Sequence, residues 1–203
     1  MKAWKEAAIQ LEQKNAKLLD LNNVKLNPKL TFTTGVILAD SGSPFRQSAL
    51  INIGRHDGVL DGWAAMDGLG LLGRISGIGK NSSRVLFLTD RSSRIPVEVT
   101  PSGQKAILAG DNTPLPPLEF VDGVDQIRAG DRVFTTGDGG VFPPGLLAGT
   151  AVFSGDGRLR VKLAADYRRL EFLRVIRHSP SAPISEPDEL VGKTLPGQMI
   201  VSE

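Results

Sequence analysis

The feature that most constrains the fold of this chain is a succession of short, strand-like segments separated by turn residues. The stretch GDRVFTTGDGGVFPPGLLAGTAV, residues 130–152, shows the pattern, with six glycines and two prolines among apolar and β-branched residues. Apolar and β-branched residues favour strands, whereas Gly and Pro favour the turns between them. No helix-length pattern interrupts the succession after residue 32. Sandwiches or barrels are therefore expected, and parallel βαβ units are not.

Twelve segments of this kind are predicted to be strands. They cover residues 34–40, 48–54, 63–66, 70–78, 84–88, 94–100, 105–109, 117–121, 132–136, 146–153, 158–165 and 170–176. The segment TDRSS at 89–93 divides them into two groups. We therefore predict two small β-barrels, the first over residues 32–90 and the second over residues 94–178.

The two halves resemble each other in the order of their signals. VLDGWAAMDGLGLLGRISGI (59–78) has a Gly-bearing turn, a strand, a second turn and then GLL leading into a Gly-punctuated strand. IRAGDRVFTTGDGGVFPPGLLAGTAVF (127–153) repeats that order with a longer second turn. Duplication of a small barrel explains the repeat, and chance similarity is the alternative.

The beginning of the chain has a different pattern. Residues 3–26 contain no Gly or Pro and many good helix formers, and Pro28 ends the segment, so a helix is predicted over residues 1–28. Its heptad stripe, expected to mediate dimerisation, comprises Trp4, Ala8, Leu11, Asn15, Leu18 and Asn22. A register using Ala7, Lys14 and Leu21 fits nearly as well. We interpret the segment as the end of a coiled coil, with a lone amphipathic helix packed on its own domain as the alternative.

The predicted fold class is therefore mainly β: an N-terminal coiled-coil-type helix followed by two small β-barrels. Residues 179–203 carry four prolines and few apolar residues, and we predict a flexible tail there. The net charge of +2 and the sequence pI near 9.0 do not indicate a nucleic-acid partner. The chain contains no run of apolar residues long enough for a transmembrane helix.

The composition argues against metal or cofactor chemistry. The absence of cysteine excludes disulfides, thiolate zinc sites and a cysteine nucleophile. The acid pairs Asp57/Asp61 and Asp122/Asp125 are interpreted as turn formers rather than metal ligands. The glycine runs do not lead into a helix, so no phosphate cradle is expected. No metal site and no cofactor are predicted, and a glycosidase carboxylate pair stays open without any spacing to support it.

The fragment TTGDGG lies one serine away from the GDSGG of chymotrypsin-like proteases. Such an enzyme needs a hydroxyl activated by a positioned histidine. The nearest hydroxyl, that of Thr136, lies on the wrong side of Gly137, and the only histidines are His56 and His178. No catalytic residue is predicted.

The glycines and prolines of residues 130–152 then have a structural interpretation. Gly130–Asp131 and Gly139–Gly140 suit tight turns that require positive φ. Gly149, inside a strand, indicates a bulge or a close backbone approach. Pro143 and Pro144 are expected to stiffen the loop, and Phe142 to plug one end of a barrel. The loop is interpreted as a device for folding back the sheet and presenting a surface.

One strand is basic. Arg158, Arg160 and Lys162 alternate and therefore share a face. A solvated outer face is the simplest interpretation, and an anionic lipid headgroup or an acidic partner surface is the alternative.

The order of these elements carries a family resemblance. NIGRHDGVLDGWAAM, GLLGRISGI and RVLFLTD are followed by GDRVFTTG and, most specifically, by FPPGL at residues 142–146. Over roughly residues 4–178 the chain resembles the rod-shape-determining MreC family. It departs from the family pattern at Thr136, where serine is usual, and in the hydrophilic GDGG. The motif and turn positions are Gly58, Gly62, Gly73, Gly130, Asp131, Gly137, Phe142, Pro143, Gly145 and Gly149.

The resemblance implies a non-catalytic scaffold of the bacterial cell-elongation machinery. Members of the family have a short cytoplasmic tail, one transmembrane helix in the inner membrane, a periplasmic coiled coil and two small β-barrels. They bind the class B penicillin-binding transpeptidase, associate with MreD and the MreB system, and self-associate as dimers or larger assemblies. On this resemblance the transmembrane helix and much of the coil lie outside this chain, and its barrels act in the periplasm.

The resemblance also suggests a division of labour. The first barrel, around residues 34–90, is expected to contact the transpeptidase, and the turn at 137–146 to support the second barrel and self-assembly. Two other functions are weaker. A periplasmic adaptor of an export complex would normally place a helical hairpin inside its β domain, and a degenerate chymotrypsin-like hydrolase lacks the serine.

Overall fold

The computed structural model describes residues 30–40, 47–167 and 170–178, which form twelve β-strands and three short 3-10 helices. The strands are β1 (Thr31–Asp40), β2 (Ser48–Ile51), β3 (Ala64–Met66), β4 (Leu71–Ile78), β5 (Ser83–Phe87), β6 (Arg94–Thr100), β7 (Gln104–Ala109), β8 (Leu118–Glu119), β9 (Arg132–Thr135), β10 (Leu147–Phe153), β11 (Leu159–Leu163) and β12 (Phe172–Arg177). The 3-10 helices are η1 (Arg55–Asp57), η2 (Val124–Gln126) and η3 (Asp138–Gly140). Each predicted strand segment overlaps one of these strands.

The predicted fold class is wrong in its helical part. The described residues contain no α-helix, and hence none that could cross a membrane, so the structure is β throughout apart from the 3-10 turns. The helix expected over residues 1–28, with its stripe of Trp4, Ala8, Leu11, Asn15, Leu18 and Asn22, lies outside the described residues, as does the tail at 179–203. The prediction relied on local helix propensity over three heptads, and so short a segment gains most of its helical stability from packing that the sequence does not specify.

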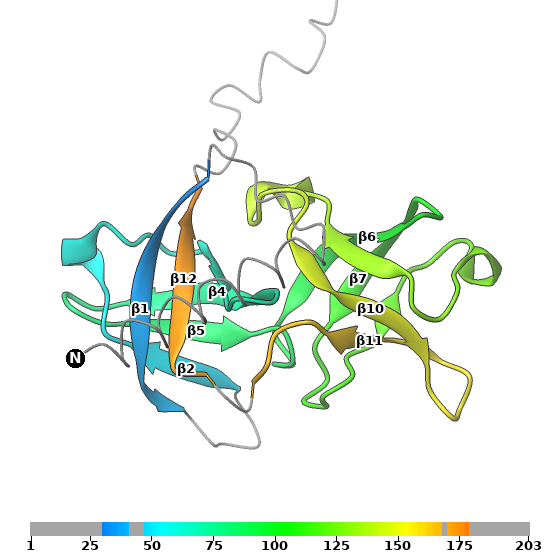
Figure 1. The fold of residues 1–203 in the computed structure, drawn as a ribbon, viewed down its shortest axis with the longest axis horizontal. Coiled ribbons are helices and arrows are strands. Elements are labelled where there is room, and N and C mark those ends of the chain that lie inside the picture. Colours follow the sequence, from blue (N-terminus) through cyan, green and yellow to red (C-terminus); the bar gives the residue numbers. More distant parts are fainter. Residues whose placement is uncertain (1–29, 41–46, 168–169, 179–203) are drawn as a thin grey trace, which may run out of the picture.

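The first unit is a closed barrel of six antiparallel strands in the order β1-β12-β3-β4-β5-β2. In Figure 1 it lies on the left, with β1 and β12 running side by side. The long register between β1 and β12, from Thr31 opposite Arg177 to Val36 opposite Phe172, joins the two ends of the described chain. Alternate side chains of these strands point inward, as the period-two pattern predicts.

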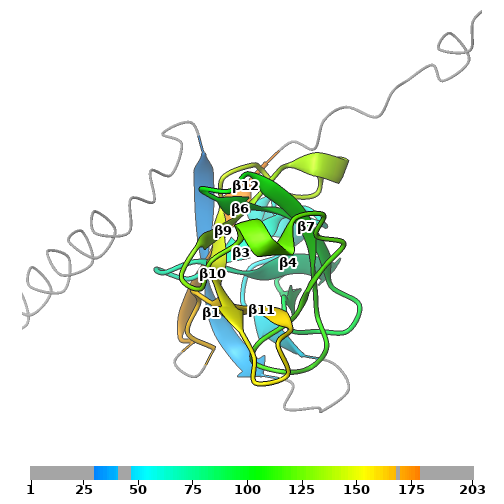
Figure 2. The same ribbon diagram turned by 90° about the vertical axis from the view of Figure 1, so that its right-hand side faces the viewer.

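The second unit is a six-stranded antiparallel sheet in the order β11-β10-β9-β6-β7-β8. Its outer strands meet where Pro117 bridges Arg160 and the Val161 amide donates to the Pro116 carbonyl oxygen at 2.9 Å. The sheet therefore curls into a second small barrel. Figure 2 shows this unit end-on, in front of the first.

The C-terminal limit predicted for the second barrel is wrong. Residues 94–178 were assigned to one barrel, but β12 pairs with β1 and β3 of the first barrel. The second unit, β6 to β11, is thus inserted between β5 and β12 of the first. The sequence could not show this, because β1 and β12 pair across more than a hundred residues and strand patterns carry no information on partners.

The hydrophobic core of the second unit includes residues of the first barrel, which also has a core of its own. Ala65 points into the first barrel, whereas its neighbours Ala64 and Met66 pack with the core of the second unit. Likewise, Leu71 packs toward the second unit and Leu72 toward the first. Strands β3 and β4 are therefore buried on both faces in their central parts, which explains their nearly continuous apolar sequence.

Polar contacts reinforce the same junction. Asp90, in the predicted junction segment 89–93, accepts hydrogen bonds from the Ser92 amide and the Gln47 amide, each at 2.9 Å. In the segment between β11 and β12, the Tyr167 hydroxyl donates to the Leu72 carbonyl oxygen at 2.8 Å. The Tyr167 ring packs edge-on against Phe87. Burial, together with the nearby Asp67 carboxylate, raises the pKa of Tyr167 well above 10.0. The phenol thus stays a neutral hydrogen-bond donor.

Candidate interaction surface

The outer face of the first barrel carries the largest group of exposed apolar side chains on neighbouring strands among the described residues. We call it the β1 face, and it comprises Phe32, Val36, Leu38, Leu50 and Phe172. Phe172 is 59% exposed and Leu38 57% exposed. Isolated apolar residues are common on protein surfaces, but several on adjacent strands indicate a binding surface.

Strand register brings these side chains together. Val36 lies opposite Phe172 in the β1–β12 ladder, so the two side chains share one face. The β1–β2 ladder shifts register between Ile37 and Ala39, and this bulge leaves Leu38 on the outer surface near Leu50, which pairs with Ala39. The face therefore spans β12, β1 and β2, which are adjacent in the barrel.

One cation lies on the same face. The Arg174 guanidinium carbon lies 4.8 Å from the centre of the Phe32 ring, which is a cation–π distance. Arg174 is opposite Thr34 in the ladder, between the two aromatic side chains. The β1 face is therefore aromatic and apolar and includes the Arg174 guanidinium, a composition typical of the centre of protein interfaces.

The loop at 137–146 is partly exposed, but Phe142, Pro143 and Leu146 are buried. Phe142 is only 3% exposed and packs in the core of the second unit. The buried Thr135 hydroxyl donates to the Pro143 carbonyl oxygen at 2.7 Å and accepts from the Leu146 amide at 3.0 Å. We call this pair of hydrogen bonds the Thr135 clamp. It was not predicted from the sequence, in which only the hydroxyl of the neighbouring Thr136 stood out. A threonine at an inward position directly before a turn is the signal that could have indicated it.

Two hairpins, β3–β4 and β9–β10, repeat one arrangement. Gly62 donates its amide to the Ile75 carbonyl oxygen, and Gly130 donates to that of Ala151. Both glycines have positive φ, at 83° and 97°. The hairpins also share a register shift and a close-packed glycine in the second strand, described next. The repeat noted in the sequence therefore corresponds to a repeated local structure.

The close-packed glycines are Gly73 in β4 and Gly149 in β10. A Cβ on Gly73 would overlap the Leu86 carbonyl oxygen of β5, and one on Gly149 would overlap the Lys162 carbonyl oxygen of β11. The close approach expected at Gly149 is confirmed. The other motif glycines, Gly58, Gly137 and Gly145, have positive φ in turns, as does the pair Gly139–Gly140. Asp131 closes its turn by accepting from the Arg128 amide at 2.8 Å.

Among the described residues, His56, His178 and Thr136 lie in separate places. His56 is exposed on η1, and His178 Nε2 lies 3.1 Å from the Gly140 carbonyl oxygen. Thr136 caps its own turn by accepting from the Asp138 amide at 3.1 Å. In the described part of the chain, no three His, Cys, Asp or Glu side chains gather where they could hold a metal ion.

The three basic residues expected on one strand have three different environments, and Arg158 lies just before β11 rather than in it. Arg158 forms an exposed ion pair with Asp156 at 3.5 Å. Arg160 Nη1 donates to Asp111 at 2.8 Å and to the Leu115 carbonyl oxygen at 2.6 Å, largely shielded from solvent. Lys162 forms no ion pair with a described residue and faces the junction between the units. Arg160 thus stabilises the contact between β11 and the segment before β8.

The ion pair between Arg160 and Asp111 predicts that the stability of the fold depends on pH. Burial raises the Asp111 pKa, but hydrogen bonds from Thr113 and Arg160 outweigh it and hold the pKa below its usual 3.8. A carboxylate with a depressed folded pKa stabilises the fold above its unfolded pKa, and this contribution is lost as the pH falls through the folded value. We expect Asp111→Asn to lower the free energy of unfolding by roughly 1–3 kcal/mol at neutral pH.

Denaturant unfolding of both proteins between about pH 7 and about pH 2.5 checks this expectation, because the difference should shrink below about pH 4. Asp156→Asn is the control, because its partner Arg158 is exposed and solvent screens the pair. A difference between wild type and Asp111→Asn that stays constant over the whole pH range would contradict the assignment.

The sequence matches a known protein family over nearly the whole barrel region. The family model described as "Rod shape-determining protein MreC, barrel core" matches residues 37–177, nearly the whole described structure. The chain belongs to the MreC family. A cell shape-determining protein MreC from Cereibacter sphaeroides is 67% identical over 193 residues, which are 95% of this chain and 64% of the relative. The chain thus spans less than two thirds of the length of that MreC.

Solved MreC structures have the same fold. A crystal structure of MreC from Pseudomonas aeruginosa aligns with a TM-score of 0.66 and 28% identity, covering 72% of this chain and 99% of that one. An MreC in a complex with the penicillin-binding protein PBP2 from Helicobacter pylori aligns with a TM-score of 0.56 at 15% identity, covering 74% of this chain and all of that one. The second likeness shows the fold alone. Membership of the MreC family does not favour the export-adaptor and hydrolase alternatives.

Proposed function

We propose that this chain is the barrel part of a non-catalytic MreC scaffold that acts in the periplasm and binds a class B penicillin-binding transpeptidase through its β1 face. Family membership supports the scaffold role, and the cluster of exposed apolar side chains on β12, β1 and β2 carries the choice of surface. The described complex of an MreC with PBP2 supports this class of partner. The β1 face has the aromatic side chains and the arginine, Arg174, that favour high-affinity contacts.

A scaffold of this kind changes a reaction only by binding. If the transpeptidase has two conformations, binding to one of them shifts the population toward it by the difference in affinity. We infer that the chain regulates peptidoglycan synthesis in this way and thereby helps to maintain rod shape. Membrane anchoring of the whole protein, contacts with MreD and the MreB system, and self-association involving the turn at 137–146 are further parts of the proposal, supported by the family alone.

The test is an affinity measurement with the cognate transpeptidase, using the full chain. Truncation after residue 90 is unsuitable because the first barrel would lose β12. That strand lies between β1 and β3 and pairs with both. The double variant Leu38→Asp/Phe172→Asp places two carboxylates on exposed positions of the β1 face. We expect it to weaken binding by about a hundredfold, since the desolvated centre of an interface carries most of the binding energy.

Phe120→Asp is the matched control because Phe120 is 81% exposed but lies on the second unit, after β8. It should leave the affinity within about twofold. Circular dichroism and thermal melting of each variant establish that the fold is retained. Loss of binding in Phe120→Asp with normal binding by the double variant would move the transpeptidase contact to the second unit.

A further inference from the structure

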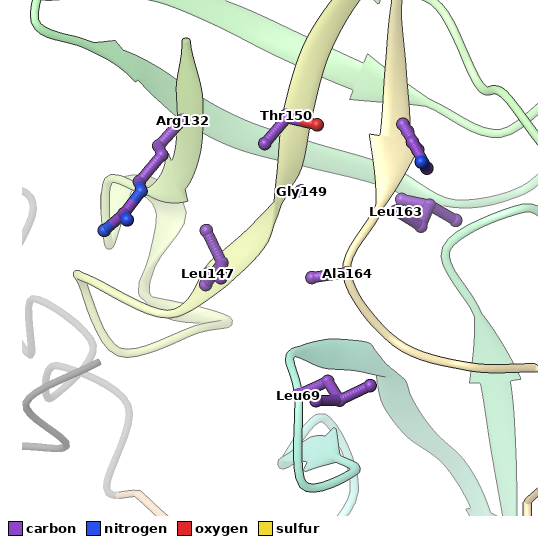
Figure 3. A pocket seen from close by; sticks show the side chains of 8 residues that line it. Leu69, Arg132, Leu147, Gly149, Thr150, Leu163 and Ala164 are labelled. Atoms are coloured by element: carbon purple, nitrogen blue, oxygen red, sulfur yellow. The ribbon is translucent and has the colours of Figure 1, made fainter. Parts of the chain in front are cut away.

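A groove lies at the junction of the two units, on the side where the turn between β3 and β4 meets β10 and β11. Its volume is about 280 Å³. Figure 3 shows Leu147, Gly149 and Thr150 on β10, Arg132 on β9, and Leu69 on the turn opposite Ala164. Leu163 and Lys162 complete the lining. The groove is separate from the β1 face, and ligand binding here does not depend on the function proposed for that face.

One wall is a row of polar side chains set by strand register. Thr150 in β10 lies opposite Arg132 in β9 and opposite Lys162 in β11, so the three side chains share one face of the sheet. Directly opposed residues have Cβ atoms about 5 Å apart, which places the Cβ atoms of Arg132 and Lys162 about 10 Å apart, with that of Thr150 between them. A carboxylate held over the Thr150 hydroxyl is therefore within reach of the flexible Lys162 side chain on the neighbouring strand.

The other wall is apolar. Leu69, Leu147 and Ala164 come from both units, so the groove exists only because the units are packed together. The wall is tight: a Cβ on Gly70 would lie 2.6 Å from the Ala164 Cβ and 2.9 Å from the Leu147 carbonyl oxygen. The Ala164 amide donates to the Ala148 carbonyl oxygen at 3.0 Å. The apolar wall is therefore fixed in place before any ligand arrives.

The local charges favour an anion. The two basic residues that precede Lys162 are engaged by acids, Arg158 by Asp156 and Arg160 by Asp111, while Lys162 has no ion-pair partner among the described residues. The nearby Asp67 carboxylate is held by backbone donors, with its oxygens accepting from the Gly70 and Asp166 amides, both at 2.7 Å. Its negative charge is thus partly compensated at the edge of the groove.

We propose that this groove binds an extended segment of a partner protein that carries a carboxylate beside a bulky apolar side chain. The carboxylate pairs with the Lys162 ammonium and accepts from the Thr150 hydroxyl, and the apolar side chain packs on Leu69 and Leu147. The volume suits one or two side chains and is at the lower limit for a small-molecule site, which favours a peptide anchor over a cofactor.

The experiment measures fluorescence anisotropy of a labelled hexapeptide of alternating glutamate and leucine with the full chain. A matched peptide has glutamine in place of glutamate. We expect the acidic peptide to bind at least about tenfold more tightly, and its affinity to fall as salt rises. Lys162→Glu and Leu69→Ser, one variant on each wall, should each weaken binding by about tenfold or more. Arg158→Glu, just before β11 and outside the groove, should leave the affinity within about twofold.

Four results would overturn the proposal. Equal binding of the two peptides, or an equal loss in Arg158→Glu and Lys162→Glu, would show that the groove does not recognise the carboxylate. Lys162-dependent binding of the chain to phosphatidylglycerol vesicles, without peptide binding, would assign the cations to a lipid surface. A tenfold gain in peptide affinity on deletion of residues 179–203 would make this chain's own C-terminal segment the occupant.

Discussion

Gly73→Ala is expected to destabilise the first barrel more than any other single methyl addition to its strands. Gly73 lies in β4, opposite Ala65 on one side and Phe87 on the other. Its new Cβ would overlap the Leu86 carbonyl oxygen and lie 2.8 Å from the Leu86 carbonyl carbon. These are backbone atoms of a strand paired on both sides, so no side-chain rotation relieves the clash. We expect a loss of about 3 kcal/mol or more in the free energy of unfolding.

A loss of that size should lower the melting temperature by roughly 6–12 °C for a chain of this length. The matched control is Gly68→Ala, in the preceding turn, where an added Cβ meets no atom within 4 Å and φ is not positive. It should melt within about 2 °C of wild type. If both alanine variants melted at the same temperature, the close approach of β4 and β5 would not be the reason for glycine at this position.

The same glycine shows what a sequence can and cannot indicate. Its position inside a strand segment was visible in GLLGRISGI, and the strand itself was predicted within a residue or two. The reason for it, the nearby carbonyl of β5, depends on which strand pairs with β4. Period-two patterns locate strands because side chains alternate at every step, but they say nothing about strand partners.

The insertion of the second unit into the first is the clearest example of this limit. The residues of β12 look like those of any other strand in the second half, and only pairing with Thr31–Val36 assigns Phe172–Arg177 to the first barrel. The β1 face could not be predicted for the same reason. Phe172 joins Val36 only through that register, although an outward Phe and Val were each visible in their own segments.

The basic strand shows the limit for charge. Arg160 and Lys162 were correctly placed on one strand with a common side-chain direction, whereas Arg158 lies just before β11. Their different environments come from Asp156 in the adjacent turn and from Asp111 in a loop that the sequence places 49 residues from Arg160. Local acid partners could be foreseen, whereas the distant one required the closure of the second barrel.

Phe142→Ala should have the largest effect on the second unit. The side chain is 3% exposed and packs with Val133, Leu146 and the surrounding buried residues. Truncating a buried phenylalanine removes its transfer free energy and leaves a cavity, which together cost about 3–5 kcal/mol. Val141→Ala is the control because Val141 is the adjacent residue and 41% exposed, so its truncation should cost less than about 1 kcal/mol.

Hydrogen exchange distinguishes a loosened loop from a destabilised unit. The Leu146 amide donates to the buried Thr135 hydroxyl, and the Thr135 amide donates to the Leu146 carbonyl oxygen at 2.9 Å, so both report on the Thr135 clamp under the loop. In Phe142→Ala we expect faster exchange at these amides and in β9 and β10, with smaller changes in β1 and β2.

Because the β1 face lies on the first barrel, the folded variant should retain its affinity for the transpeptidase. Faster exchange in β1 and β2 equal to that in β9 and β10 would instead mean that the shared core couples the two units into one cooperative fold.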